Sequence, residues 1–212
     1  DNDNQMLQLG RFLGMVHQVG AARPFLHRPT INHQTFLLDS QQSLLQSGLI
    51  PPSLEKDYQA MMQQLCDKVG PLYKPEKIRR VHGDCHIGNL LWHDDRPLLL
   101  DFDDSRNGPA VQDLWLLLNG DRVEQNYQLS LLLEEYEQYC DFDHKELRLI
   151  EPLRAMRILS YMAWIAKRWS DPAFPKNFPW FSTDQYWQQQ LRALDEQLKF
   201  CDQSPLSLMP QW

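Results

Sequence analysis

The 212-residue chain carries a formal net charge of −7 at pH 7, and 42% of its residues are hydrophobic. This acidic balance argues against nucleic-acid binding, which depends on Lys and Arg to neutralise phosphates. No apolar run approaches the roughly 18 residues of a membrane span, and we expect no signal peptide. Four scattered cysteines indicate no disulfide framework, so we expect a cytoplasmic protein with no membrane partner.

The first predicted helix covers residues 5–19, where apolar residues recur at helical spacing. Gly10 and Gly14 lie on one face of this helix, which would let another helix approach closely. His17 is predicted to lie at the polar rim of the helix rather than to bind a ligand.

A proline-bearing segment follows at residues 21–52, and it contains Arg23 and Arg28. These arginines could touch a phosphate or the acidic loop described below, although exposed arginines are usually only solvated. Residues 53–69 then give the clearest helix, with Ser53 as its cap and a Gly-Pro pair as its stop.

The densest chemistry lies in the stretch that begins at His82. Asp84 completes a His-x-Asp pattern, Asn89 comes five residues after Asp84, and an apolar run ends at Asp101. Phosphoryl transfer requires this order, because a carboxylate must meet the substrate hydroxyl while an Asn and a second Asp hold the magnesium ions that bridge the ATP phosphates. We therefore predict Asp84 and Asp101 as catalytic residues, Asn89 and Asp101 as magnesium ligands, and ATP as co-substrate.

Two short apolar runs on either side of a polar turn predict a β-hairpin within this stretch. With the turn centred on Asp95, Asn89 lies opposite Asp101 and the two could share a cation. Leu91 then lies opposite Leu99 on the same face, which makes Leu91 a candidate floor for the purine ring of the nucleotide.

Two other interpretations of the stretch remain open. It could be a solvated loop with a coincidental motif, since acidic hairpins are common on surfaces. It could also be a zinc site, although zinc sites usually show tighter Cys or His pairs with a second cluster downstream. The candidate zinc ligands are His82, Cys85, His86 and His93.

The chain after the motif is predicted to be largely helical. Helices are expected at residues 111–118, 122–139 and 145–169. Asp113 sits among apolar neighbours, and a buried carboxylate needs hydrogen-bond partners. We expect it to brace the catalytic or metal loop through backbone amides. Its alternative role is that of a charge at the start of a helix.

Aromatic residues collect in the last third of the sequence. Trp164 and Trp169 are predicted to be core or rim residues, and an aromatic substrate cage is the alternative. Residues 171–181 are too rich in proline for regular structure, so we expect an aromatic belt there or a wall of the substrate cleft. A last helix, capped by Ser182 or Thr183, is expected to lead into a tail at residues 202–212 that frays.

The motif residues resemble those of the aminoglycoside phosphotransferase, choline kinase and homoserine kinase group, and the chain is most similar to the bacterial stress response kinases within it. The resemblance rests on His82 to Asn89 and on Asp101 to Asp103, with support from the Gly108-to-Trp115 and Trp164-to-Trp169 stretches. It implies that Asp84 accepts the proton and that Asn89 and Asp101 bind magnesium. Cys85 departs from the group, which more often has an apolar residue there, and is interpreted as a packing substitution.

The resemblance also implies a fold, namely the mainly α, α+β lower lobe of the protein kinase-like fold with small β-hairpins at the active cleft. No Gly-x-Gly and no strand lysine of the kinase type occurs in residues 1–212. We therefore expect these residues to be the C-terminal lobe of a longer enzyme whose N-terminal nucleotide lobe is absent, with residues 1–4 as the inter-lobe connector.

The expected activity is magnesium-dependent phosphoryl transfer from ATP to a hydroxyl. The resemblance implies Ser or Thr on a protein as the acceptor. A small-molecule alcohol such as an aminoglycoside, choline or homoserine is the alternative acceptor. An isolated lobe that only binds a partner and has no activity is the second alternative. We expect a monomer.

Overall fold

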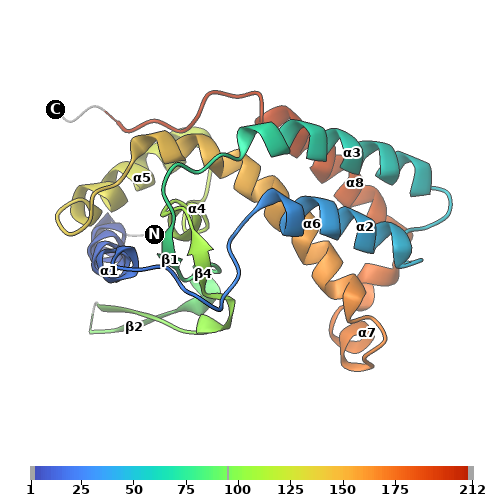
Figure 1. Cartoon of the computed structure of the whole chain (residues 1–212), viewed down its shortest axis with the longest axis horizontal. Helices are drawn as coiled ribbons and strands as arrows, with labels where there is room; N and C mark the ends of the chain where they lie inside the picture. Colours follow the sequence, from blue (N-terminus) through green and yellow to red (C-terminus); the bar gives the residue numbers. More distant parts are fainter. Residues whose placement is uncertain (1–2, 95, 210–212) are drawn as a thin grey trace. The chain divides into compact units, whose positions relative to one another are not determined.

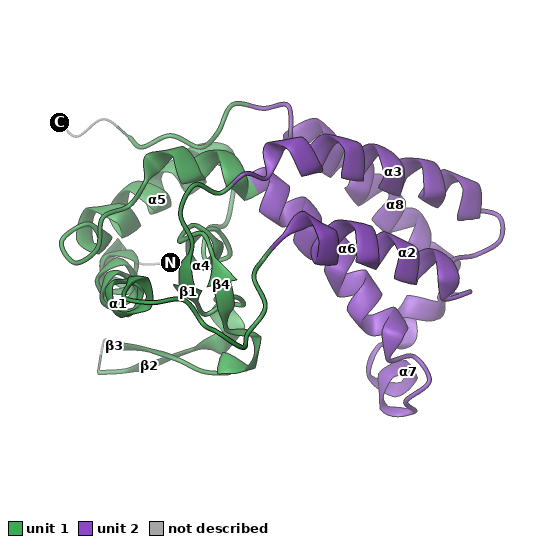
Figure 2. Ribbon diagram, viewed as in Figure 1, with its two compact units in different colours: residues 1–31, 75–150, 204–212 green, residues 32–74, 151–203 purple. Residues whose placement is uncertain are grey.

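The computed structural model describes residues 3–94 and 96–209 and is mainly helical, with two small antiparallel strand pairs. The mainly α fold predicted from the sequence is confirmed. The chain divides into two compact units (Figure 2). Unit 1 consists of residues 1–31, 75–150 and 204–212, and unit 2 consists of residues 32–74 and 151–203. No helix among the described residues is long and apolar enough to cross a membrane.

Unit 1 is built around the packing of helix α1 (Asp3–Ala21) against helix α5 (Arg122–Tyr136) (Figure 1). Gly10 and Gly14 make this contact possible, as predicted. A Cβ atom at Gly10 would collide with the carbonyl oxygen of Leu132, and one at Gly14 would lie 2.6 Å from the carbonyl oxygen of Tyr136. The glycine face therefore lets the two helix backbones approach closely, and it buries the residues that share this face.

The two strand pairs lie in unit 1. Strand β1 (Arg79–Val81) pairs with β4 (Arg106–Gly108), and β2 (Leu90–His93) pairs with β3 (Arg96–Leu99) to form the predicted hairpin. Three short 3₁₀ turns join or follow these strands in the unit: η2 (Ile87–Asn89), η3 (Phe102–Asp104) and η4 (His144–Leu149).

The predicted register of the hairpin is wrong by one residue. Leu91 pairs with Leu98 rather than Leu99, and His93 pairs with Arg96, which leaves a two-residue turn. Asp94 adopts a left-handed backbone with φ of 48°, a conformation that two-residue hairpin turns use. Asp95, the predicted centre of the turn, lies outside the described residues.

Helix α4 (Gln112–Trp115) is shorter than the predicted 111–118 helix. Helix α5 begins with a capping box in which Asp121 and Glu124 satisfy each other's backbone N–H groups. The predicted 145–169 helix is divided, because the 3₁₀ turn η4 precedes helix α6 (Ile150–Lys167).

Unit 2 contains helices α2 (Asp39–Gln46), α3 (Glu55–Leu72), most of α6, and α8 (Asp184–Phe200), with a π-helical turn, η1 (Gln34–Leu38), before α2. Ser53 does not cap α3, whose N-cap residue is Leu54 and has no side-chain hydrogen bond. This helix also continues through the predicted Gly-Pro stop. Thr183 caps α8 by accepting a hydrogen bond from the backbone N–H of Tyr186, which confirms one of the two predicted caps.

The aromatic segment at residues 171–181 is more regular than predicted. It contains helix α7 (Ala173–Asn177), and the 3₁₀ turn η5 (Pro179–Ser182) begins within it. The ring of Trp164 packs against Phe174 with centroids 5.1 Å apart, and Phe181 packs against Trp187 at 5.0 Å. Edge contacts between rings hold the segment together and give the expected belt, in which proline at the first position of η5 is compatible with a helical turn.

The tail is ordered through residue 209, so the prediction that it frays is wrong for these residues. The backbone N–H of Ser207 donates to Asn126, that of Met209 donates to Ser130, and Leu206 is buried. Of the predicted connector at residues 1–4, Asp3 already belongs to α1, whereas residues 1–2 lie outside the described range, as do residues 210–212 of the tail.

Candidate active site

The loop that carries Asp84 is held by a buried carboxylate, as predicted. Asp113 accepts hydrogen bonds from the backbone N–H of His82 at 2.6 Å and from that of Gly83 at 2.8 Å. Gln112 donates to the carbonyl oxygen of Gly83 at 2.8 Å. Gly83 has φ of 88°, and a Cβ atom there would collide with the backbone of the 102–104 turn. Adjacent residues of α4 thus fix the backbone from which Asp84 extends.

Asp113 is itself supported by a chain of buried side chains. Nε2 of His17 lies 3.0 Å from Asp113, and Nδ1 of His17 lies 2.9 Å from the hydroxyl of Tyr136. Arg79 donates to the same hydroxyl at 3.1 Å. Because Arg79 can only donate, this arrangement leaves the hydroxyl proton for Nδ1 of His17 and places a proton on Nε2, which donates to Asp113.

The prediction that His17 lies at a polar rim is therefore wrong, since its side chain is fully buried. The reason is the close packing of α1 on α5. The sequence contained the signal, because His17 follows Gly10, Leu13 and Gly14 at helical spacing and so lies on the glycine face.

Asp84 and Asn89 interact directly. The amide nitrogen of Asn89 donates to the carbonyl oxygen of Asp84 at 3.0 Å and lies 3.5 Å from its carboxylate. His86 accepts a hydrogen bond from the N–H of Gly88 through Nδ1, so Nε2 carries its proton and faces the Asp84 carboxylate at 3.3 Å. The loop thereby holds the candidate base from two sides.

His82 has a structural role that the motif alone did not reveal. Its Nδ1 accepts from the backbone N–H of Asp84 at 3.3 Å, so Nε2 donates to the carbonyl oxygen of Leu100 at 2.8 Å. His82 therefore connects the loop of the candidate base to the residue immediately before Asp101.

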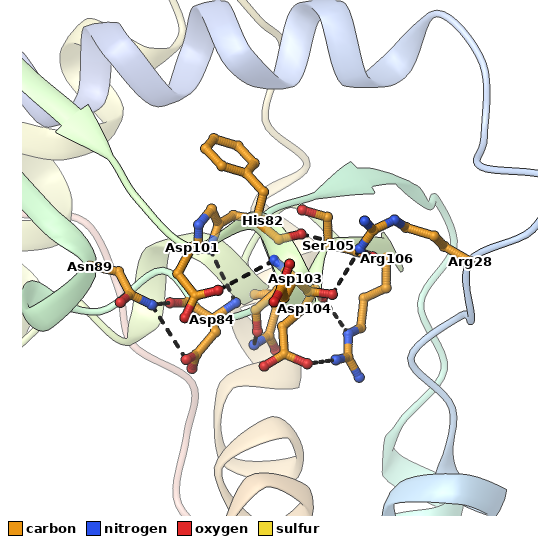
Figure 3. A network of polar contacts seen from close by, with 12 residues as sticks. Arg28, His82, Asp84, Asn89, Asp101, Asp103, Asp104, Ser105 and Arg106 are labelled. Atoms are coloured by element: carbon orange, nitrogen blue, oxygen red, sulfur yellow. Dashed lines mark hydrogen bonds and ion pairs between the residues drawn. The ribbon is translucent and has the colours of Figure 1, made fainter.

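Asp101 reaches the site by a different route from the predicted one. Asn89 does not pair with Asp101 across the hairpin, because the backbone N–H of Leu100 donates to the carbonyl oxygen of Asn89 at 2.9 Å. Asp101 then adopts a left-handed conformation with φ of 58°, which turns the chain into η3. Figure 3 shows Asp84, Asn89 and Asp101 in one cluster, so the structure brings the predicted residues together despite the wrong register.

The donor set of this cluster fits a hard cation. The amide nitrogen of Asn89 is bonded to Asp84, which leaves the amide oxygen as a possible ligand beside the carboxylate of Asp101. Oxygen ligands of this kind suit Mg²⁺, which usually takes one or two protein ligands and completes its shell with phosphates and water. The described residues contain no group of three or more His, Cys, Asp and Glu side chains placed to hold a metal by themselves.

The four residues proposed for zinc do not form such a group. The side chain of His93 is 80% exposed, and Cys85 is fully buried. Burial raises the pKa of the Cys85 thiol well above its ordinary value. Cys85 packs as a small apolar side chain, which agrees with its interpretation as a packing substitution.

Leu91 lies on the exposed face of the hairpin, with its side chain opposite Leu98, and both are about half exposed. Leu99 lies on the other, buried face. The role of Leu91 as a floor for a purine ring stays a prediction.

Comparisons with known proteins identify the family of this chain. Residues 1–150 match the phosphotransferase enzyme family (APH), and the chain belongs to that family. It is 46% identical over 213 aligned residues to stress response kinase A of Escherichia coli K12, and equally similar to serine/threonine protein kinase RdoA of Salmonella typhimurium LT2. The alignments cover all of this chain and 65% of each relative. The resemblance stated from the motif residues is confirmed.

Solved structures support the kinase-like fold. The chain superposes on amicoumacin kinase hAmiN with a TM-score of 0.64 and 19% identity, covering 97% of this chain and 61% of that one. It superposes on spectinomycin phosphotransferase APH(9)-Ia with a TM-score of 0.60 and 15% identity, covering 95% and 67%. At these identities the likeness establishes the fold alone.

Proposed function

We propose that the protein containing this chain transfers a phosphoryl group from ATP to a hydroxyl, with magnesium. The clustering of Asp84, Asn89 and Asp101 around a loop that Asp113 holds carries this proposal. ATP and magnesium would supply the phosphoryl group and the neutralising charge. In most phosphoryl transfers, positioning and charge neutralisation do most of the catalysis.

The residues of this chain would divide the work as follows. Asp84 accepts the proton of the acceptor hydroxyl and orients its oxygen for in-line attack. The amide oxygen of Asn89 and the carboxylate of Asp101 hold the cation. Membership of the phosphotransferase family supports this assignment, as does the AMP-PNP bound to the kinase hAmiN.

The proposed acceptor is Ser or Thr on a protein. The support is the 46% identity to proteins named stress response kinase A and serine/threonine protein kinase RdoA. A small alcohol is the second candidate, because the names of the structural relatives describe an amicoumacin kinase and a spectinomycin phosphotransferase. The far higher identity to the first group favours protein.

We propose further that these 212 residues alone turn over ATP negligibly, because they contain no Gly-x-Gly loop and span 65% of the curated relatives. A cytoplasmic location and a monomeric state belong to the same proposal. Robust phosphorylation by the 212 residues that disappears in Asp84→Asn would contradict the statement on turnover.

The test uses the intact gene product with labelled ATP and Mg²⁺, with a protein mixture or with small alcohols. We expect label on protein Ser or Thr that falls by at least about 100-fold in Asp84→Asn, in line with the loss of a general base. Asp94→Asn is the matched control, since Asp94 is an exposed hairpin residue outside the cluster. Consumption of ATP only in the presence of a small alcohol would instead identify a small alcohol as the acceptor.

A further inference from the structure

A short strap, residues 25–31, is attached to strand β4 through Asn107. The backbone of Asn107 donates to the carbonyl oxygen of Pro29 at 3.0 Å and accepts from the N–H of Ile31 at 2.8 Å. Its side chain accepts from the N–H of Phe25 at 2.8 Å and donates to the carbonyl oxygen of Phe25 at 3.0 Å. All four polar groups of the buried Asn107 thus hold the strap.

The strap carries Arg28 to the turn that follows Asp101. Nη1 of Arg28 lies 3.1 Å from the carbonyl oxygen of Phe102, 2.8 Å from that of Asp103 and 3.1 Å from that of Ser105 (Figure 3). These three carbonyl groups converge at the end of η3, where the carbonyl oxygen of Phe102 also accepts from the backbone N–H of Ser105 at 3.1 Å. A guanidinium, which only donates hydrogen bonds, suits such a cluster of acceptors.

Two other side chains hold the backbone on either side of Asp101: His82 donates to the carbonyl oxygen of Leu100 at 2.8 Å, and Arg106 donates to that of Asp104 at 2.6 Å. Asp101 holds a left-handed backbone that is unfavourable for a residue with a Cβ atom. Its carboxylate accepts only a long hydrogen bond, 3.4 Å, from the N–H of Asp103. Moving the 102–105 backbone would therefore rotate the Asp101 carboxylate, and Arg28 binds that backbone from a segment 74 to 77 residues away in the sequence.

We propose that Arg28 is a positioning residue, which sets the orientation of the Asp101 carboxylate toward its cation by fixing the 102–105 turn. This inference rests on the proposed function and deepens it. Arg28 touches neither the reacting atoms nor the cation, so its effect is on how well Asp101 serves as a ligand. The sequence left two possible partners for Arg28, a phosphate or the acidic loop, and in the structure Arg28 contacts the acidic loop.

The charge of Arg28 makes the proposal sharply testable. If Arg28 acted only as a nearby positive charge, its removal would favour cation binding, because like charges repel. A positioning role has the opposite sign, since loss of a group that orients a metal ligand typically weakens metal affinity by about 10–100-fold. Arg23→Ala is the matched control, because it removes one exposed positive charge just before the strap.

The experiment titrates Mg²⁺ against the initial rate of the intact gene product and measures the KM for the acceptor. In Arg28→Ala we expect the half-saturating Mg²⁺ concentration to rise by at least about 10-fold, with the acceptor KM unchanged. Arg28→Lys keeps one donor group, so its half-saturating Mg²⁺ concentration should lie between those of wild type and Arg28→Ala. Arg23→Ala should behave as wild type. An unchanged or lower Mg²⁺ requirement, or an effect on acceptor KM alone, overturns the proposal.

Hydrogen exchange provides a readout that does not depend on activity. In Arg28→Ala, amide exchange should accelerate in a peptide spanning residues 101–106 and stay unchanged in one spanning 82–89. Acceleration throughout unit 1, or none in 101–106, overturns the inference. If wild type and Asp84→Asn are equally inactive, the proposed function fails while the exchange result still decides the role of Arg28. If only Asp84→Asn loses activity and Arg28→Ala keeps its Mg²⁺ requirement, this inference alone fails.

Discussion

The two halves of the candidate site are held in opposite ways. The loop that carries Asp84 presents backbone N–H groups to a fully buried carboxylate, Asp113, which further buried side chains support. The turn after Asp101 presents carbonyl oxygens to an exposed guanidinium, that of Arg28. The first half is therefore part of the core of unit 1, whereas the second is attached at the surface.

This difference predicts which substitutions change the stability of unit 1 and which change mainly the geometry of the site. Removing one partner of a buried hydrogen bond leaves the other desolvated and unpaired, whereas water replaces a lost partner at the surface. Changes behind Asp84 should therefore destabilise the whole unit. Changes behind Asp101 should alter the site with little effect on folding.

The largest expected effect comes from Asp113→Ala, which breaks the buried half. We expect the free energy of unfolding to fall by about 3–5 kcal/mol, because each buried donor left unpaired costs about 1–3 kcal/mol. Urea denaturation measures it. Asp113→Asn keeps the shape of the side chain and one acceptor oxygen, so its free energy of unfolding should fall by less. A change below about 1 kcal/mol, the typical value for surface pairs, would remove the contrast between the two halves.

A smaller effect is expected from Gly10→Ala, which pushes α1, and His17 with it, away from α5. The added Cβ would collide with the backbone carbonyl of Leu132, and overpacking of this kind costs about 1–3 kcal/mol. Gly70→Ala is the matched control within helix α3, where nothing lies within 4 Å of the new atom. It should stabilise by up to about 1 kcal/mol through helix propensity. Equal melting temperatures of the two variants would contradict the prediction.

The smallest expected effect concerns Glu146, a buried residue next to the half of the site that carries Asp84. Glu146 accepts from the backbone N–H of Val111 at 2.9 Å, just before α4, and burial raises the pKa of its carboxyl above its ordinary value of 4.5. Between 4.5 and the raised pKa the folded protein binds more protons than the unfolded chain, so this group's contribution to stability falls as pH rises.

Glu146→Gln removes this titration. The difference in unfolding free energy, wild type minus variant, should therefore decrease as pH rises above 4.5, by about 1.4 kcal/mol per unit of pKa shift. Urea unfolding at several pH values measures it. A difference that stays flat with pH would mean that Glu146 does not titrate in this range.

Local patterns predicted much of the fold and the cluster of site residues. Periodicity placed α1, α3 and α5, a cap residue placed α8, and the motif order placed Asp84, Asn89 and Asp101. The sequence also predicted that Asp113 braces the loop, because a carboxylate among apolar neighbours must find donors.

The misses depend on contacts that local patterns do not contain. The hairpin register depends on the left-handed backbone of Asp94. The sequence pattern of a polar turn does not distinguish a two-residue turn from a three-residue turn. The burial of His17 depends on α5, whose Tyr136 lies 119 residues further along the chain. The strap around Arg28 carried too weak a pattern to distinguish its two possible partners, and only the folded structure supplies the converging carbonyl groups.

The discontinuity of unit 1 has a consequence for biosynthesis. Helix α1 emerges before its packing partner α5, which is completed only when residue 136 has been made. At about 5–20 residues per second, translation therefore leaves the glycine face of α1 and its histidine without their packing partner for several seconds. During that time the His82-to-Asp84 motif can already be present in a nascent chain. A chain arrested before Tyr136 would therefore carry the motif without the buried scaffold that turns it into a site.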